Sequence, residues 1–360
     1  MAYTNIDDPS AYFQTAIYTG AGSTVVTVTN DGNSDLQPDF LWFKRRDSAG
    51  GHALLDTSRG ANVTSGFGPT GYSFVLNSNS TASEVADSTG VMTITSDGFT
   101  AKELTYAGGN TNTGSMVAWQ WHCNAGSTSS NTDGSITSTV QANQDAGFSI
   151  VTYDGNGSNN QTIGHGLGAT PDLILIKNRN QAANWTTFHK ALGTSKHMRL
   201  NSTNAAATES GFWHSLSTTL FGVKFYDEYN NSAGEYVAYC FAEKQGYSKF
   251  GKYVGNGNSN GPFVYTGFKP AFLIMKRTDS TGNWVMFDTK RDTHNVTKHR
   301  LFPNLTNADN TTRNYIDLLS NGFKMRDTDV DHNASGATII YMAFAENPFV
   351  TSTGVPTTAR

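Results

Sequence analysis

Three short hydrophobic runs of the chain share one pattern. Each begins at a proline, passes through large apolar residues and ends in basic or polar residues, as in residues 38–46, PDFLWFKRR. The pattern returns in residues 171–179, PDLILIKNR, and in residues 270–277, PAFLIMKR. Runs of this length suit a strand better than a helix, so each one predicts a strand that is buried on both faces.

A second pattern recurs with nearly the same spacing as the first. An alternating strand that ends in tyrosine is followed by a Gly-x-Gly turn, and the three tyrosines are Tyr18, Tyr153 and Tyr253. Glycine suits such turns because they often need positive φ. Two patterns that repeat in step indicate one unit written three times, and each unit has the size of a small domain.

The rest of each copy also predicts strands. A second strand follows the buried one, and each copy closes on a hydrophobic strand, at residues 116–121, 236–241 and 339–344. Many short strands without a convincing amphipathic helix predict an all-β protein of three tandem β-sandwich domains. The predicted boundaries are 1–124 for copy 1, 148–249 for copy 2 and 250–349 for copy 3. A Ser/Thr/Asn-rich linker, with an edge strand near residues 136–140, is predicted over 125–147, and a polar tail over 350–360.

Composition limits the possible partners. Charged residues make up 15% of the chain and the net charge is −4, so there is no broad basic field to attract nucleic acid. No stretch approaches the ~20 apolar residues that span a bilayer, so no membrane insertion is expected. The N-terminus lacks the basic start and apolar core of a signal peptide, which predicts synthesis and retention in a cytoplasm. The two cysteines, Cys123 and Cys240, fall in different copies, so no disulfide is expected.

Several phrases resemble a family of virion structural and tail-fibre-like proteins of tailed bacteriophages. They are residues 1–8 (MAYTNIDD), 165–168 with 171–172 (HGLG, PD), 247–251 (YSKFG), 265–270 (YTGFKP) and 342–349 (MAFAENPF). The resemblance covers essentially the whole chain. It implies lectin-like or jelly-roll-like sandwiches in a virion that is assembled in the cytoplasm of a host bacterium. It supplies no catalytic residues.

The expected function is therefore a non-enzymatic structural component of a phage particle. The favoured role is a tail-associated fibre or adhesin, a homo-oligomer that contacts other virion proteins and contributes to attachment to a host-surface polysaccharide. The alternative is a capsid decoration or tail-accessory protein without a host ligand, which the lack of heptads and of a long shaft supports. A polysaccharide-acting enzyme is a minor alternative, since paired carboxylates need only spatial proximity.

Comparison of the copies argues against catalysis. Asp56, His189 and Asp288 hold equivalent positions after the second strand, yet a shared active site would not exchange an acid for an imidazole. Neither a nucleophile elbow nor a phosphate-binding loop is present.

Two aromatic residues are the candidates for ligand binding. Trp213 lies beside Phe212 in a polar segment, and Tyr229 lies in an acidic, tyrosine-containing link between strands of copy 2. Trp185 and Trp284 fall at one repeat position, where His52 stands in copy 1, and are predicted to be core residues instead of a ligand platform.

Charged loops supply the remaining candidates. Asp327, Asp329 and Asp331 alternate along a loop and could bind Ca²⁺, or they could form a solvated acidic turn. No other cofactor is expected. The basic ends of the repeated strand, Lys44 and Lys276 among them, are predicted to be solvated edge charges or subunit contacts.

Overall fold

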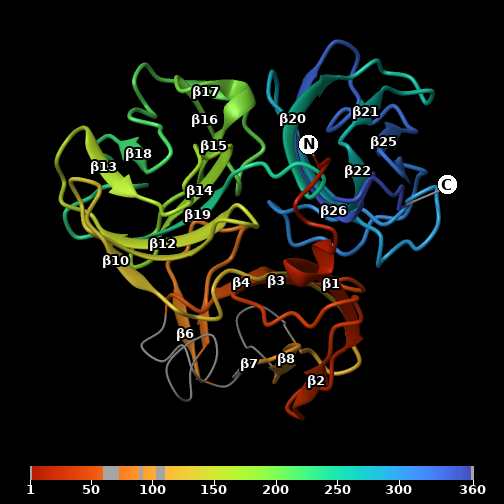
Figure 1. The fold of residues 1–360 in the computed structure, drawn as a ribbon, viewed down its shortest axis with the longest axis horizontal. Helices are drawn as coiled ribbons and strands as arrows, with labels where there is room; N and C mark the ends of the chain where they lie inside the picture. The colour runs from red at the N-terminus through yellow and green to blue at the C-terminus, as the bar shows by residue number, and fades with distance from the viewer. Residues whose placement is uncertain (1, 60–72, 89–91, 103–109, 358–360) are drawn as a thin grey trace.

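The computed structural model describes residues 2–59, 73–88, 92–102 and 110–357. Within these ranges the protein is all-β, with several antiparallel sheets and no α-helix. Two short 3₁₀ turns, η1 (Pro9–Ala11) and η2 (Lys190–Leu192), are its only described helical elements. The three copies form three lobes that meet at the centre of the molecule (Figure 1). No helix in the described part of the chain is long and apolar enough to cross a membrane.

Each copy contributes one main sheet, and the four core strands have the same order in all three. In copy 1 the order is β1 (Phe13–Thr19), β9 (Ser115–Trp121), β3 (Phe40–Arg45) and β4 (His52–Asp56). In copy 2 it is β12 (Phe148–Asp154), β19 (Glu235–Phe241), β14 (Leu173–Asn178) and β15 (Thr186–His189). In copy 3 it is β20 (Ser248–Val254), β26 (Thr338–Pro348), β22 (Phe268–Arg277) and β23 (Trp284–Asp288). The repeated hydrophobic run is therefore an interior strand of each sheet.

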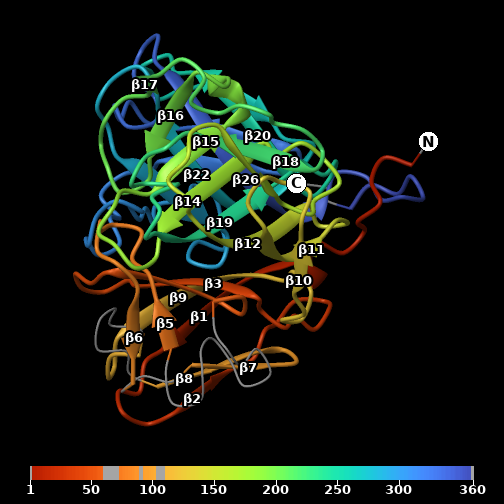
Figure 2. The same ribbon diagram turned by 90° about the vertical axis from the view of Figure 1, so that its left-hand side faces the viewer.

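Smaller sheets lie on the outer side of each main sheet. They are β2 (Val26–Val28), β8 (Gly98–Ala101) and β7 (Thr93–Thr95) in copy 1, β13 (Gln161–Gly164) and β18 (Leu220–Val223) in copy 2, and β21 (Phe263–Tyr265), β25 (Gly322–Met325) and β24 (Ile316–Leu319) in copy 3. A further hairpin joins β5 (Ser73–Val75) to β6 (Val85–Asp87). Figure 2 shows β2, β7 and β8 at the far end of copy 1, with β1, β3 and β9 facing the other copies.

Both faces of the main sheets are apolar. In β3, Leu41 and Phe43 share a cluster with Phe99 of the smaller sheet. Phe40 and Trp42, on the opposite face, belong to a central cluster to which all three copies contribute. Burial on both faces confirms the prediction for this strand, and it explains why the strand reads as a continuous apolar run.

The predicted linker over residues 125–147 contains two strands, of which the second overlaps the edge strand expected near residues 136–140. β10 (Ser129–Asn131) pairs with β11 (Ser138–Asn143), and β11 pairs along β12, so both extend the main sheet of copy 2. β16 (Lys196–Arg199) and β17 (Ala207–Thr208) extend the same sheet at its other end. A polar segment can form an edge strand because only one of its faces needs apolar residues. Cys123 and Cys240 are both buried and free, as predicted.

The three main sheets close a ring around the central cluster. In each junction a backbone N–H donates to a carbonyl oxygen of the next copy: Glu84 to Arg179 (2.6 Å), Ala206 to Thr278 (2.9 Å) and Asp309 to Arg46 (2.7 Å). These bonds join copy 1 to copy 2, copy 2 to copy 3, and copy 3 back to copy 1. We call the junctions seam 1–2, seam 2–3 and seam 3–1. Head-to-tail contacts that close after three steps have the geometry of a cyclic trimer, here within one chain.

The residues that open the second strand of each copy reach across the seams. Trp185 Nε1 donates to Asn77 O (2.9 Å) and Trp284 Nε1 to Arg199 O (3.0 Å). His52, which replaces them in copy 1, lies 2.9 Å from Phe302 O through Nε2. Trp185 and Trp284 are buried, so they are core residues as predicted.

The residues that close the second strand explain the exchange of acid for imidazole. Asp56 accepts from Tyr239 Oη (2.6 Å) and Asp288 accepts from Trp119 Nε1 (3.0 Å). Met342 takes the place of Tyr239 and Trp119 in copy 3 and offers no donor. His189 instead lies 3.1 Å from the backbone oxygen of Tyr341 through Nε2, while its Nδ1 accepts from Ala191 N. These positions are polar contacts between copies.

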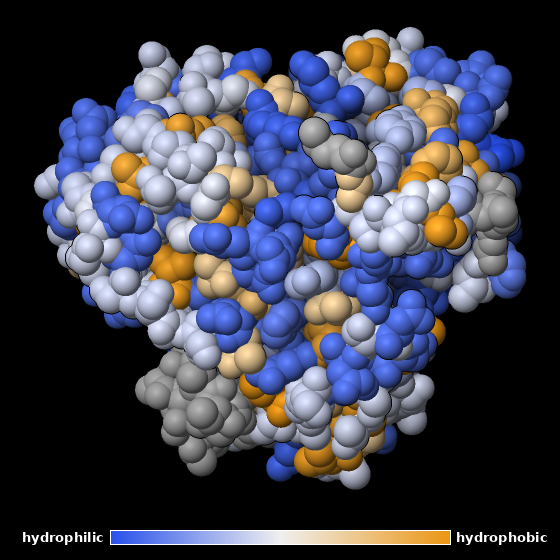
Figure 3. All heavy atoms as spheres, viewed as in Figure 1, coloured by the Kyte–Doolittle hydropathy of each residue, from blue (hydrophilic) through white to orange (hydrophobic). Residues whose placement is uncertain are grey.

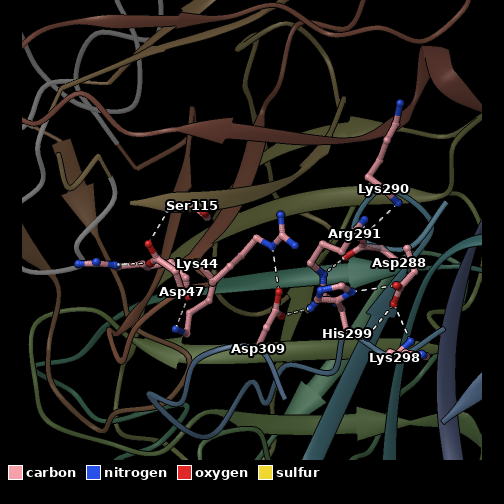
Figure 4. Close-up of polar contacts among 12 residues, drawn as sticks. Lys44, Asp47, Ser115, Asp288, Lys290, Arg291, Lys298, His299 and Asp309 are labelled. Carbon is pink, nitrogen blue, oxygen red and sulfur yellow. Dashed lines mark hydrogen bonds and ion pairs between the residues drawn. The ribbon is translucent and has the colours of Figure 1, made fainter. Parts of the chain in front are cut away.

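Buried ion pairs reinforce two of the seams. In seam 3–1, Arg291 lies between Asp288 and Asp309, at 2.6 Å from each, and Arg46 contacts Asp309 at 2.9 Å (Figure 4). In seam 1–2 the corresponding chain is Asp56, Arg59, Glu84 and Arg179. On the face of the molecule in Figure 3, hydrophilic residues gather where the lobes meet.

The repeated lysines also lie at the seams. Lys44, Lys177 and Lys276 are buried, which corrects the prediction of solvated edge charges for Lys44 and Lys276. Lys177 Nζ donates to Thr81 O (3.1 Å) and Lys276 Nζ to Thr203 O (3.2 Å), each in the preceding copy. Burial lowers the pKa of all three to about 8. Lys177 and Lys276 therefore satisfy carbonyl groups of the neighbouring copy, whereas Lys44 Nζ donates to Arg45 O within copy 1.

Candidate functional site

A groove of about 280 Å³ lies on the outer side of copy 2, at the β16–β17 edge of its main sheet. Its walls come from β16, from β17 and the turn after it, and from the link between β18 and β19. The lining residues are His197, Arg199, Ala207, Thr208, Glu209, Phe212, Tyr226, Glu228 and Tyr229. The groove therefore joins a short edge strand to two polar connections.

A row of aromatic rings forms one side of the groove. Tyr226 is 52% exposed and stacks on Tyr229, with 5.7 Å between ring centroids and 20° between planes. Tyr229 meets Phe212 edge-on at 5.0 Å, and Phe212 stacks on His197 at 4.0 Å. One exposed ring thus rests on a rigid buried row. Such a ring presents a flat apolar face and a polar hydroxyl to a ligand.

Charged groups form the other side. Arg199 pairs with Glu228 at 2.9 Å, and Glu228 also accepts from Asn184 (2.6 Å) and Thr186 (3.1 Å). Glu228 is buried and has these partners, so it holds Arg199 in place. Glu209 is more exposed and contacts Lys224 at 3.3 Å. The rim therefore offers both donors and acceptors.

His197 is a buried polar group of the groove without a complete set of partners. Its Nδ1 has no hydrogen-bond partner in the described part of the chain. Burial is the main cause that lowers the pKa of His197 below its ordinary value, and the nearby Arg199 cation adds to it. A neutral imidazole next to a groove can donate or accept one hydrogen bond from a ligand.

The turn that carries Tyr226 and Tyr229 is held by its backbone. Tyr153 Oη donates to Tyr229 O (2.8 Å), and the Asn230 side chain accepts from Asn156 N (3.0 Å). Copy 3 repeats these bonds at Tyr253, His332, Asn256 and Asn333. The frame is therefore shared between copies, while the side chains that it presents differ.

Only one of the two predicted ligand-binding residues lines the groove. Tyr229 lines the groove, although the residue itself is buried. Trp213 is only 2% exposed and packs against Phe188 and Phe212, so the prediction of an exposed ring is wrong. The polar sequence around Trp213 suggested exposure, but the short turn after β17 directs its ring into the core of copy 2.

The three predicted metal ligands are not brought together. Asp327 Oδ1 lies 2.8 Å from His332 Nε2, Asp329 pairs with Arg300 at 2.8 Å, and Asp331 accepts from Asn283 N at 2.7 Å. No group of three or more His, Cys, Asp or Glu side chains in the described ranges could hold a metal ion. Each of the alternating carboxylates therefore has a partner within the protein, and His332 lies near both Asp327 and Asp329.

Several groove residues were not singled out from the sequence: Tyr226, Phe212, His197 and Arg199. One signal could have found Tyr226. It stands where copy 3 has Asp329, since both residues offer the carbonyl that closes the same turn. An aromatic residue that replaces an acid at an equivalent turn indicates a surface that one copy alone presents.

Comparison with protein-family models gives one result that covers nearly the whole chain. Residues 8–348 match the family described as a domain of unknown function, DUF7483, so the chain belongs to that family. No curated protein and no solved structure matches the chain.

Proposed function

We propose that this member of the DUF7483 family is a non-enzymatic structural component of a phage particle that binds host-surface glycan. In this proposal the three copies are lectin-like β-sandwiches in the jelly-roll style, located in the virion. The protein would act as a tail-associated fibre or adhesin, as a homo-oligomer among other virion proteins. The observation that carries the glycan role is the exposed Tyr226 ring above Tyr229, beside Arg199 and Glu209.

The chemistry of the groove suits a sugar. A pyranose has an apolar C–H face that packs on an aromatic ring, and hydroxyl groups that both donate and accept hydrogen bonds. Tyr226 supplies the ring, while Arg199, Glu209 and Thr208 supply polar partners at the rim. A shallow groove gives weak binding at one site. Many copies of the protein in one particle would raise the overall avidity.

The alternative function is a capsid decoration or tail-accessory protein without a host ligand. The observation in its favour is the compact three-lobed shape, with each copy tied to both others across seams (Figure 1). A fibre is usually extended, whereas this chain closes on itself.

Glycan arrays separate these functions. We expect wild-type protein to bind a subset of bacterial surface polysaccharides, and Tyr226→Ala to weaken that binding about tenfold, which corresponds to ~1.4 kcal/mol. Tyr265→Ala is the matched control, because Tyr265 is 53% exposed and lies in copy 3, outside the groove.

Two outcomes would contradict the adhesin. One is the absence of binding to any polysaccharide of the host, together with stoichiometric incorporation on the phage head. The other is equal loss of binding in both variants. Release of reducing sugar by the wild-type protein would instead support the enzyme hypothesis.

A further inference from the structure

Seam 3–1 contains a second pocket, which is separate from the groove. Its volume is about 380 Å³, which is in the range of small-molecule sites. Copy 1 contributes η1, the start of β1 and the loop of residues 31–33. Copy 3 contributes the start of β22, the end of β26 and residues 289–293. Lys290 is one of its walls and extends away from the Asp288–Arg291–Asp309 network (Figure 4).

The same place is filled in seam 1–2. There Gln141 of β11 is fully buried, and its Oε1 accepts from Thr57 Oγ1 (2.9 Å) and Ser58 Oγ (2.7 Å). Thr57 and Ser58 correspond to Thr289 and Lys290, because each pair directly follows the aspartate that ends the second strand. Within its described residues, copy 1 has η1 before β1 and no strand that corresponds to β11. The group that closes seam 1–2 is therefore missing from seam 3–1.

Seam 2–3 is closed in another way. Glu243 accepts from Lys190 at 2.7 Å and from Lys249 at 2.5 Å. Its carboxylate also lies 3.4 Å from the backbone N–H of Phe250 in β20. Two of the three equivalent places are thus filled by the protein's own oxygen acceptors, and the third is open.

One strand position distinguishes the open seam from the closed ones. Thr15 of β1 is opposite Trp119, Ile150 of β12 is opposite Tyr239, and Phe250 of β20 is opposite Met342. The position is apolar in copies 2 and 3 and polar in copy 1. Thr15 lines the pocket, and its buried hydroxyl has no hydrogen-bond partner among the residues that the structure describes. Buried hydroxyl groups normally have a partner, so a ligand group is the natural complement.

The charges of the pocket are balanced. Lys269 pairs with Glu346 at 2.7 Å, and Lys290 pairs across the seam with Asp31 at 2.6 Å. A free anion or cation would have to compete with one of these partners. A neutral molecule with several hydroxyl groups would instead donate to the carboxylates and accept from the ammonium groups. Phe13, Ala271 and Ala345 give the pocket an apolar side.

We propose that the seam 3–1 pocket binds a neutral monosaccharide unit between copy 1 and copy 3. Hydroxyl groups of the sugar take the place that Gln141 Oε1 holds in seam 1–2, with Thr289 as a donor and Thr15 as a further partner. The C–H face of the sugar lies against Phe13. This site does not depend on the groove in copy 2, so either site can exist without the other.

The test uses the full-length protein with glucose, galactose, mannose, N-acetylglucosamine and their disaccharides as probes. Binding is followed by saturation-transfer NMR and calorimetry. We expect at least one probe to bind, and Thr15→Ile to weaken that binding at least tenfold, because the variant lacks the hydroxyl that faces the pocket. The variant should still fold, because copy 2 already accommodates isoleucine at this strand position. Thr289→Val removes one hydroxyl from the pocket and should weaken binding about fivefold.

Control variants distinguish binding in the seam 3–1 pocket from binding in the groove and from effects on folding. Thr27→Ile makes the same chemical change on an exposed position of β2 and should leave binding unchanged. Tyr226→Ala removes the groove ring and should also leave seam binding unchanged. Unfolding midpoints of all variants report on the fold. The proposal is overturned if no probe binds, or if Thr15→Ile folds and binds as wild type. Loss of sugar binding in Tyr226→Ala alone would assign that binding to the groove.

Discussion

Seam 3–1 and seam 2–3 occupy equivalent places in the ring. Three corresponding positions are charged in seam 3–1 and carry no fixed charge in seam 2–3. In seam 3–1 the carboxylates of Asp288 and Asp309 are neutralised by the buried Arg291. In seam 2–3 the corresponding residues are His189, Ala206 and Leu192, and none of them carries a fixed charge. The backbone bonds across the two seams are of the same kind, at 2.9 Å in seam 2–3 and 2.7 Å in seam 3–1. The frame of a seam is therefore set by main-chain pairing, which tolerates different side chains.

The difference in charge between the two seams follows from the side chain that the last strand of the next copy presents, Trp119 in seam 3–1 and Met342 in seam 2–3. Trp119 brings a donor to seam 3–1, and a carboxylate accepts from it. Met342 brings none to seam 2–3, so an imidazole there bonds to the backbone instead. A buried carboxylate then requires a cation, because an unpaired charge in the interior is costly. Next to the end of the second strand, buried charges are thus paired in seam 3–1 and absent in seam 2–3.

The largest effect is expected from removal of one member of the buried network. Arg291→Met leaves Asp288 without a paired cation and Asp309 with Arg46 alone, and it should lower the free energy of unfolding by about 3–5 kcal/mol. Denaturant titration measures this change. Arg277→Met is the control, since Arg277 pairs with the exposed Asp279 at the surface and should cost less than about 1 kcal/mol.

A triple variant sharpens the same test. Asp288→Asn with Arg291→Met and Asp309→Ala removes all three charges and keeps an acceptor for Trp119. It should be more stable than Arg291→Met alone, although it carries two more substitutions. A triple variant that is less stable than Arg291→Met would contradict this view. It would show that the two carboxylates stabilise seam 3–1 even without the Arg291 cation.

The buried imidazole of His189 should make seam 2–3 respond to pH. Burial is the main cause that lowers the pKa of His189 from its ordinary value of 6.5 to about 4. The unfolded chain therefore takes up a proton between pH 6.5 and 4 while the folded chain does not, so stability falls as pH falls through this window. The contribution is about 3 kcal/mol by linkage. Unfolding at pH 4.5 and 7 should differ less in His189→Gln than in the wild type. An unchanged difference would contradict this role.

A smaller effect is expected in seam 1–2. Tyr239→Phe removes the hydroxyl that donates to Asp56 at 2.6 Å, while Arg59 still neutralises the carboxylate. The expected loss is about 2 kcal/mol, as for a hydrogen bond to a charged group. Tyr226→Phe removes a hydroxyl from an exposed ring and is the control, with no measurable change in the unfolding midpoint. Equal effects would show that the Asp56 bond is not special.

Much of the fold could be predicted from local pattern. The run of residues 40–43 has an apolar residue at each position, so the strand had to be buried on both faces whatever the topology. The repeat and its all-β character followed from spacing in the same way. Residues 125–147 were harder, because a polar segment becomes a strand only when β12 offers it an edge.

The candidate site depended more on tertiary contacts. The acidic link predicts a ligand contact at Tyr229, which lines the groove, but the polar neighbours of Trp213 predict an exposed ring that the structure does not have. A two-residue strand and a turn are enough to direct the Trp213 ring inward, and no periodicity records that direction. The Asp327, Asp329 and Asp331 pattern likewise could not reveal that two of the carboxylates have partners from other segments, Asp329 with Arg300 and Asp331 with Asn283.

By itself, the sequence determined the three units, their strands and the apolar faces of those strands. These properties are local, because they depend on residue type and on a period of two. Only the tertiary structure decided that the inner faces meet in one central core and that the seams close a ring. It also decided that one seam keeps a pocket where the others are filled. Those outcomes depend on which side chains from distant copies face each other, as Met342 and His189 illustrate.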